Sequence, residues 1–256
     1  MEKLFNPFSL KGKTIIVTGA SSGIGRQCAI TCSRMGARLV LIARNQERLE
    51  EALTMLEGVG HHSYIYDFSS CEGIASLVSA IVNDCGRIDG MVYAAGIEKT
   101  VPFKLLKPED YSAIIQVNTL SALEMARQVS SMKNFSKESG GLVFIASITA
   151  SIARAGTAAY TASKGALVST TRVLATELAK RKIRVNCVSP GTVLTPLMEN
   201  FLSTLSEEDY KKRIDGFPLG LGTTDDIANA CVFLLSDASR WMTGQNLIVD
   251  GGYTIK

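Results

Sequence analysis

Residues 14–25 read TIIVTGASSGIG, an apolar run that leads directly into a glycine-rich turn. The run has the length and composition of a buried strand, and the residues that follow are typical of a helix. Glycines permit a tight turn and a close approach of the backbone to a ligand. Because a helix N-terminus attracts negative charge, the turn predicts a pyrophosphate site. The predicted contacts are Gly19, Ser21, Ser22, Gly23, Ile24 and Gly25.

The rest of the chain repeats this alternation of a short apolar run and a longer amphipathic stretch. Several runs are continuously apolar, which suits strands that are covered on both faces. Strands are predicted at residues 14–18, 38–42, 63–66, 90–93, 142–146, 183–188 and 247–249, and helices at 23–35, 46–57, 74–83, 109–132, 158–180 and 225–235. This alternation predicts an α/β fold with a parallel sheet and helices on both faces.

The chain is expected to form a single domain over residues 1–256, because no linker, repeat or charge block divides it. Residues 195–222 interrupt the rhythm before the last strand with apolar residues set among charges. An insertion at the carboxyl end of a strand is where a substrate lid would lie, and a surface helix that covers the core is the equal alternative.

Composition is that of an ordinary globular protein, with 46% hydrophobic and 20% charged residues. The net charge of +3, from 27 basic and 24 acidic residues, is too small and dispersed to predict a nucleic-acid or membrane partner. No stretch approaches the ~20 apolar residues that span a bilayer. Residues 1–10 show no signal-peptide pattern, so a cytoplasmic location is expected.

The six cysteines are predicted to be small buried side chains. None of them forms a Cys-x-x-Cys pair, and the only histidines, His61 and His62, are adjacent to each other. A disulfide scaffold is not expected at this chain length and cysteine density. No metal site is predicted, because the histidines lie far from any cysteine pair.

The spacing Thr-Gly-x-x-x-Gly-x-Gly at residues 18–25 differs from the Gly-x-Gly-x-x-Gly of most dinucleotide-binding folds. It resembles the turn of the short-chain dehydrogenase/reductase family, and the resemblance covers residues 8–253. It implies a Rossmann-type, doubly wound, seven-stranded parallel sheet in the order 3-2-1-4-5-6-7. It also implies a homotetramer or homodimer, with the predicted helices 109–132 and 158–180 as the interface.

Three further strand ends agree with the resemblance, which assigns them to the cofactor. In the family, the third strand end contacts the adenine, the fourth lets the backbone approach the cofactor, and the turn after the sixth holds the carboxamide. The residues at these positions are Asp67, Phe68, Ala95, Gly96, Pro190, Gly191, Val193 and Thr195. Tyr93 and Ala94 depart from the pattern, because the family has asparagines there that hydrogen-bond within the core.

The end of the second strand indicates which nicotinamide cofactor is preferred. Sites selective for NAD place an acid here to hold the ribose 2′-hydroxyl, whereas NADP sites offer an arginine to the 2′-phosphate. The strand ends at Ala43 and is followed by Arg44 and Asn45. The planar guanidinium of arginine suits a phosphate. We therefore predict that NADP(H) is preferred over NAD(H), with Arg44 and Asn45 as contacts.

Tyr160 and Lys164 form the candidate catalytic pair, because residues four apart on a helix share a face. A nearby ammonium favours the phenolate and is expected to lower the pKa of the tyrosine. A tyrosine tuned in this way can exchange a proton with a carbonyl or alcohol oxygen. Ser147, at the end of the strand 142–146, can hydrogen-bond the same oxygen.

In the family this serine, tyrosine and lysine work with an asparagine on the preceding long helix, and Asn118 matches that position. The resemblance implies that Tyr160 is the general acid/base and that Ser147 polarises the substrate oxygen. It further implies that Lys164 lowers the pKa of Tyr160 and binds the nicotinamide ribose, as a cofactor contact like Tyr160. Asn118 would hold a water in the proton relay.

The expected activity is therefore reversible hydride transfer between NADP(H) and a carbonyl or alcohol carbon of a small molecule. The chain looks most like the 3-oxoacyl-[acyl-carrier-protein] reductase group, which implies an acyl-carrier-protein thioester as substrate. However, residues 218–222 read PLGLG without that group's arginine, and residues 133–141 are less basic than an acidic carrier requires. Thioester reduction and oxidoreduction of a small ketone or sugar stay open, as does a non-catalytic cofactor-binding regulatory subunit.

Overall fold

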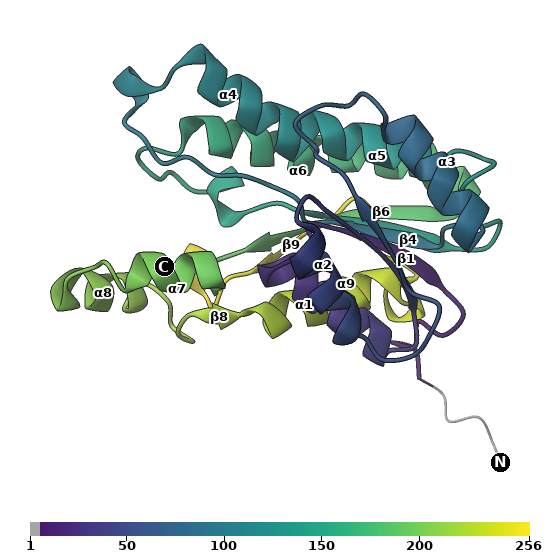
Figure 1. Ribbon diagram of the computed structural model, residues 1–256. Helices are drawn as coiled ribbons and strands as arrows, with labels where there is room; N and C mark the ends of the chain where they lie inside the picture. The colour runs from purple at the N-terminus through teal and green to yellow at the C-terminus, as the bar shows by residue number, and fades with distance from the viewer. Residues whose placement is uncertain (1–5) are drawn as a thin grey trace.

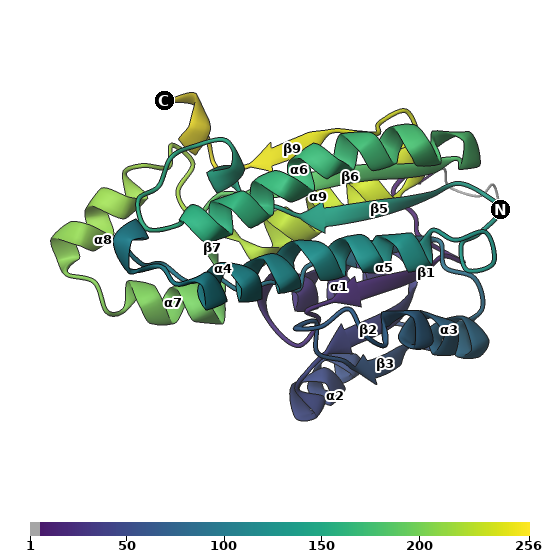
Figure 2. The same ribbon diagram turned by 90° about the horizontal axis from the view of Figure 1, so that it is seen from above.

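The computed structural model describes residues 6–256. The prediction that residues 1–10 are not a signal peptide therefore lies partly outside the described residues. A seven-stranded parallel sheet runs through the molecule in the order β3-β2-β1-β4-β5-β6-β9, as Figures 1 and 2 show. This order confirms the prediction. The strands are β1 Thr14–Thr18, β2 Arg38–Ala43, β3 His62–Ile65, β4 Gly90–Tyr93, β5 Gly140–Ile145, β6 Ile183–Pro190 and β9 Asn246–Val249.

Helices cover both faces of the sheet, as predicted (Figure 1). One face carries α1 Gly23–Arg34, α2 Gln46–Thr54 and α9 Thr224–Leu235. The other carries α3 Ile74–Cys85, α5 Ser121–Val129 and α6 Ala158–Leu178. Within residues 6–256, no helix is long and apolar enough to cross a membrane.

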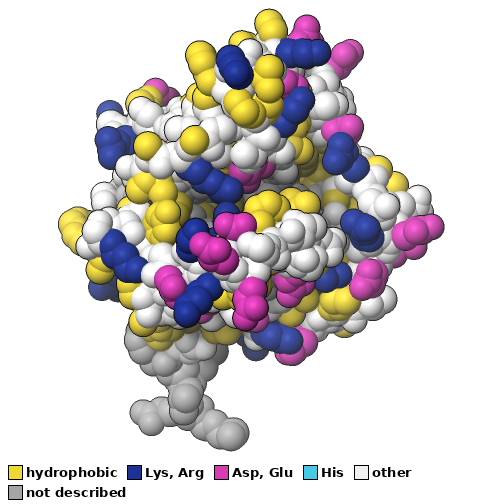
Figure 3. All heavy atoms as spheres, turned by 90° about the vertical axis from the view of Figure 1, so that its left-hand side faces the viewer, with side chains coloured by type: hydrophobic (Ala, Val, Ile, Leu, Met, Phe, Trp, Pro, Cys, Tyr) yellow, Lys and Arg dark blue, Asp and Glu magenta, His cyan; other side chains and the backbone are white. Residues whose placement is uncertain are grey.

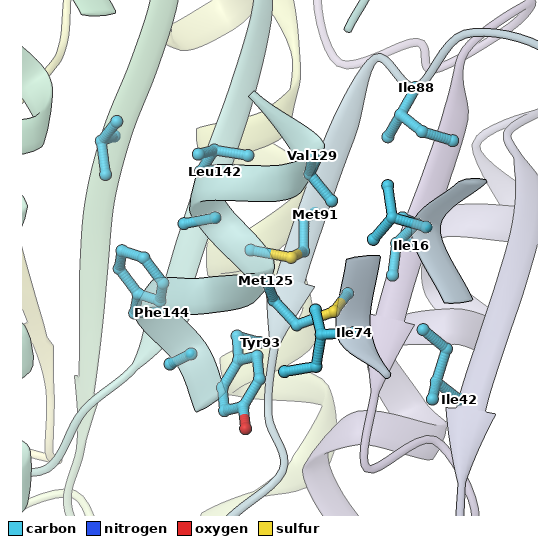
Figure 4. Close-up of a cluster of buried hydrophobic side chains, with 14 of the residues drawn as sticks. Ile16, Ile42, Ile74, Ile88, Met91, Tyr93, Met125, Val129, Leu142 and Phe144 are labelled. Atoms are coloured by element: carbon cyan, nitrogen blue, oxygen red, sulfur yellow. The ribbon is translucent and has the colours of Figure 1, made fainter. Parts of the chain in front are cut away.

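The core consists of two apolar layers, one between the sheet and each set of helices. Figure 4 shows the layer under α3 and α5, where Met91 and Tyr93 of β4 lie near Met125 of α5. Alternate residues of each central strand enter opposite layers, which is why these strands are apolar throughout. Five of the six cysteines are buried and all six are free thiols, in agreement with the expected packing role.

The helix predicted at residues 109–132 forms as one run, but it is not regular and it ends at Val129, three residues earlier than predicted. It comprises α4 Pro108–Ile115, a wide π turn, η2 Gln116–Leu120, and α5. The hydroxyl of Tyr93, buried in the core, donates a 2.7 Å hydrogen bond to the carbonyl oxygen of Val117 inside this turn. A side chain that binds a main-chain carbonyl of a helix competes with the regular ladder and accounts for the wide turn.

Residues 195–222 form two helices beyond the carboxyl ends of the strands, α7 Pro196–Leu202 and α8 Glu207–Ile214 (Figure 2). A short parallel ladder that the sequence did not predict closes the base of this insertion. It pairs β7 Val193–Leu194 with β8 Gly222–Thr223. One-turn helices occur at Phe103–Leu105, Ile148–Ala150, Ala179–Arg181, Asp237–Ser239 and Tyr253–Ile255.

We predict that Tyr93→Phe lowers the free energy of unfolding by about 1–2 kcal/mol, because the buried Val117 carbonyl loses its donor. Burial raises the pKa of Tyr93, so the hydroxyl remains a donor over the working pH range. Urea denaturation followed by circular dichroism measures the change. Tyr66→Phe is the matched control, because its hydroxyl bonds exposed carbonyls that water can reach. An equal loss in both variants would contradict this account.

Candidate active site

The four candidate catalytic residues come from three segments that meet at the carboxyl ends of β4 and β5. Ser147 lies just beyond β5 and begins the one-turn helix Ile148–Ala150, with its hydroxyl accepting from the Thr149 amide at 3.2 Å. Tyr160 and Lys164 lie in the first two turns of α6, which packs against η2 and so places Asn118 beside them. The structure therefore brings all four predicted residues together.

Lys164 is a buried cation that is fixed by the main chain. Its Nζ donates a 2.8 Å hydrogen bond to the carbonyl oxygen of Ile145, at the end of β5, and lies 5.6 Å from the ring centroid of Tyr160. Burial lowers the pKa of Lys164 to about 8. The amine can therefore gain or lose a proton close to neutral pH.

Tyr160 differs from the sequence prediction, which expected Lys164 to lower the pKa of the phenol. Burial, followed by the negative charge of Glu98, raises the pKa of Tyr160 to about 12. Hydrogen bonding by Ser147 and the charge of Arg154 oppose this rise and do not overcome it. Loss of water around the phenolate outweighs these interactions, so Tyr160 is protonated at neutral pH.

Asn118 holds neighbouring segments in place with nearly all of its hydrogen-bonding capacity. Its Nδ2 donates to the carbonyl oxygen of Ile97 at 2.9 Å and to the hydroxyl of Ser163 at 3.0 Å. Its Oδ1 accepts from the Ile97 amide at 2.8 Å. Both N–H donors and one acceptor position are used, so the side chain is a positioning group. At most one acceptor position, on Oδ1, remains for the water that the resemblance implies.

The glycine turn has the close packing that its sequence predicts. Gly19 has a φ of +64°, and a Cβ atom at Gly25 would collide with the Gly19 carbonyl oxygen. Ser22 begins α1 in an extended conformation. Thr195 comes from the distant turn after β6, and its Cγ2 would lie 3.3 Å from a Cβ at Gly23. The turn assigned to the pyrophosphate and the turn assigned to the nicotinamide carboxamide thus lie next to each other.

Thr18 was missed as a supporting residue, although it opens the glycine motif. Its buried hydroxyl oxygen accepts from the amides of Ala94 at 3.1 Å and Ala95 at 3.0 Å. This pair of hydrogen bonds ties the end of β4 to the end of β1 without either asparagine of the family pattern. Tyr93 supplies the remaining link through Val117.

The residues predicted for the adenosine end form an exposed cluster after β2 and β3. Arg44 Nη1 lies 3.9 Å from Asp67 Oδ2, and both side chains are more than half exposed. Asn45 caps α2, with Oδ1 accepting from the Arg48 amide at 2.8 Å. The ring of Phe68 is buried, unlike the side chains of Arg44 and Asp67, and its carbonyl oxygen accepts from the hydroxyl of Ser121 at 2.8 Å.

The residues predicted for the nicotinamide end follow β6. Pro190 is the last residue of β6, and the Gly191 amide donates to the carbonyl oxygen of Val249 at 2.9 Å. Val193 is buried in β7, and Thr195 caps α7 by accepting from the Met198 amide at 3.2 Å. Hydrogen bonds to β9 and to the first turn of α7 therefore hold the turn after β6 in place beside the glycine turn.

Proteins of known activity resemble this chain over almost its whole length. Residues 19–254 match the family model described as enoyl-(acyl carrier protein) reductase. D-threitol dehydrogenase of Mycolicibacterium smegmatis is 35% identical over 252 residues, which cover 97% of this chain and 95% of the relative. The 3-oxoacyl-[acyl-carrier-protein] reductase of Thermotoga maritima is 32% identical over 249 residues, which cover 96% of this chain and 99% of the relative.

A solved structure from Beutenbergia cavernae, described as an NAD(P)-dependent gluconate 5-dehydrogenase, contains NADP at low occupancy. It superposes on this chain with a TM-score of 0.87 at 32% sequence identity. The match covers 98% of this chain and 100% of that one. The similarity therefore includes the whole sheet and the insertion at residues 195–222.

Proposed function

The chain belongs to the short-chain dehydrogenase/reductase family, and we propose that it is an NADP(H)-dependent enzyme that interconverts a carbonyl and an alcohol carbon. The proposal rests on the arrangement of Ser147, Tyr160 and Lys164, which lie together at the carboxyl ends of the strands. The glycine turn after β1 and the turn after β6 are adjacent at the same end of the sheet. The two curated relatives named above are both oxidoreductases.

The residues of the two turns fit a dinucleotide. The cradle formed by Gly19 and Gly25 has no room for a Cβ atom at position 25, and the start of α1 faces it, as a pyrophosphate requires. A bound nicotinamide would supply the hydride, and the chain's own residues would supply position and protons. Thr195 and Val193 would hold the carboxamide, and Lys164 the ribose.

The proton chemistry follows from the pKa values of two residues. In carbonyl reduction, protonated Tyr160 donates to the developing alkoxide while Ser147 hydrogen-bonds the same oxygen. In alcohol oxidation, the Tyr160 phenolate accepts the hydroxyl proton. Lys164, whose pKa burial lowers to about 8, lies 5.6 Å from the Tyr160 ring centroid and is a nearby proton source for the phenolate that carbonyl reduction leaves. Asn118 keeps the loop after β4 in place.

NADP(H) preference is proposed from the chemistry at the end of β2. Ala43 is buried and apolar, so the strand end offers no acid to a ribose 2′-hydroxyl. Arg44 is exposed, and a 2′-phosphate would compete with Asp67 for its guanidinium. The bound NADP in the Beutenbergia structure supports the same assignment.

We also propose that α7 and α8 form the substrate lid of a single domain, because they lie beyond the carboxyl ends of the strands, at the end of the sheet where α6 begins (Figure 2). A homodimer or homotetramer is supported by exposed apolar side chains on and next to the predicted interface helices. Met132, in the turn after α5, and Val173, in α6, are 79% and 54% exposed. A groove of about 620 Å³ also lies between α6 and the residues before β9.

Tyr160→Phe is expected to lower turnover at least about 100-fold, because the variant cannot exchange the proton. The assay follows NADPH and NADH absorbance with a 3-oxoacyl thioester, simple ketones and keto-sugars. Tyr64→Phe, on the edge strand β3, is the control and should retain activity. Tight NADPH binding without turnover of any compound would favour the non-catalytic regulatory subunit.

Arg44→Ala is expected to weaken NADPH binding about 10- to 100-fold and NADH binding less than about 3-fold, because only NADPH carries the 2′-phosphate. Fluorescence titration of each cofactor measures the ratio. Arg34→Ala is the control. Arg34 lies in the last turn of α1, near the amino ends of the strands, so both affinities should be unchanged. An unaltered NADPH/NADH ratio in Arg44→Ala would show the assignment to be wrong.

Glu98→Gln is expected to shift alcohol oxidation to lower pH. The charge of Glu98 helps to raise the pKa of Tyr160, so its removal lowers that pKa and yields the phenolate at less alkaline pH. The measurement is kcat/KM for oxidation as a function of pH, with Glu138→Gln as an exposed control. A midpoint that stays in place or rises would contradict the role given to Glu98.

A further inference from the structure

Residues 250–256, which we call the post-β9 segment, fold back onto residues 215–220, where the chain returns from the insertion. The rings of Tyr253 and Phe217 lie 4.6 Å apart between centroids, at an angle of 33°. A Cβ atom at Gly216 would lie 3.0 Å from Cε2 of Tyr253, so the tyrosine ring packs directly on the main chain there. Aromatic rings at this spacing attract each other beyond their burial of apolar surface. Tyr253 therefore holds the chain just after α8.

Hydrogen bonds and a close main-chain approach join the same two segments. The Leu219 amide donates to the carbonyl oxygen of Gly251 at 3.0 Å. Nζ of Lys256 donates to the carbonyl oxygen of Asp215 at 2.6 Å. Gly251 has a φ of +60°, and a Cβ atom on it would lie 2.9 Å from the carbonyl oxygen of Gly220. Glycine is the residue that permits both this conformation and this approach.

Asp250 fixes the shape of the post-β9 segment. Its Oδ1 accepts from the Gly252 amide at 3.0 Å, and its Oδ2 accepts from the Thr254 amide at 2.8 Å. Its carbonyl oxygen accepts from the Tyr253 amide at 3.1 Å. Aspartate commonly stabilises a turn by such bonds to the amides that follow it. The ring of Tyr253 is therefore presented from a turn that the segment itself closes.

Phe217 connects the post-β9 segment to the turn after β6. Its ring is buried, and Cε1 would lie 3.1 Å from a Cβ atom at Gly191. Cα of Asp250 would lie 2.9 Å from the same Cβ atom, so Gly191 is enclosed between Phe217 and the start of the post-β9 segment. The turn that is assigned to the nicotinamide carboxamide thus packs on Phe217, and Phe217 packs on Tyr253.

The post-β9 segment lies far from the residues assigned to the adenosine end of the cofactor. Arg44 and Asp67 follow β2 and β3, whereas β9 is the edge strand on the other side of the sheet. Figure 3 shows the end of the molecule that carries α7 and α8, where apolar side chains lie among charged ones at the surface. Tyr253 is 36% exposed, so its ring can be removed without opening a cavity in the core.

We propose that Tyr253 is a positioning residue for the nicotinamide half of the cofactor, because it holds Phe217 against the turn after β6. The inference rests on the proposed function, which assigns this turn to the carboxamide. Tyr253 acts through Phe217 and needs no contact with the cofactor. Loss of its ring would release Phe217 and then Gly191, so fewer molecules would have the turn in place. Apparent affinity falls with the fraction of the protein that is competent to bind.

Binding of a whole and a partial cofactor to the same variant tests this inference. Isothermal titration calorimetry compares NADP⁺ with adenosine 2′,5′-bisphosphate, which carries the 2′-phosphate and has no nicotinamide. Tyr253→Ala should weaken NADP⁺ binding about 3- to 10-fold, the range expected for the loss of one aromatic pair. Binding of the bisphosphate should change less than about twofold, because distant sites act independently.

Further variants separate positioning from general damage. Tyr253→Phe keeps the ring and should bind both ligands as the wild type does. Ile255→Ala removes an exposed side chain from the same segment and should also leave both affinities unchanged. Phe217→Leu fills most of the space without the aromatic contact and should weaken NADP⁺ binding alone. A protein with both Tyr253→Ala and Phe217→Leu should lose no more affinity than the weaker single variant, because the two residues act through one contact.

Three results would overturn the inference. They are an unchanged ratio of the two affinities in Tyr253→Ala, an equal loss for both ligands, and additive losses when Tyr253→Ala and Phe217→Leu are combined. If Tyr253→Ala fails to fold, the ratio in Phe217→Leu decides. A wild-type protein that binds neither ligand would remove the proposed cofactor and the positioning role together. A wild type that binds both, with no change of ratio in the variants, would remove the positioning role alone.

Discussion

The constraint on which this molecule depends is the parallel direction of all seven strands of its main sheet. Parallel strands require a crossover after each strand, and the crossovers place helices on both faces. Both faces are then buried, so the side chains of the central strands belong to the core. The carboxyl ends of all seven strands lie at one end of the sheet. Polar side chains from distant segments can come together there without being buried in the core.

Much of the fold was predictable because the strands carry a local signal. The bounds of β1 and β4 agree with the sequence analysis, since both strands are continuous apolar runs bounded by turns or charges. The wide turn in the helix at residues 116–120 was not predictable, because it depends on the Tyr93 hydroxyl from another segment. The β7–β8 pair was missed for a similar reason, since two-residue strands have no periodicity.

The candidate site likewise combines residues that a local pattern predicts with interactions that depend on distant segments. Ser147, Tyr160, Lys164 and the glycine turn were found because they lie at strand ends or at helical spacing. The charges that act on Tyr160, those of Glu98 and Arg154, come from two separate loops, and no local pattern joins them. Sequence reasoning therefore gave the pKa of Tyr160 the wrong direction: it considered the nearby ammonium and had no measure of burial.

The wide turn at residues 116–120 also bears on how this chain can change. A π turn holds about one residue more than an α-helical turn, so it takes up that residue without the rotation of about 100° that one extra residue gives a regular helix. The face of α4 that packs against α6 and the face of α5 that packs against α3 therefore keep their directions on either side of the wide turn. This stretch is thus the place where the long helix can hold an extra residue without turning one half against the other.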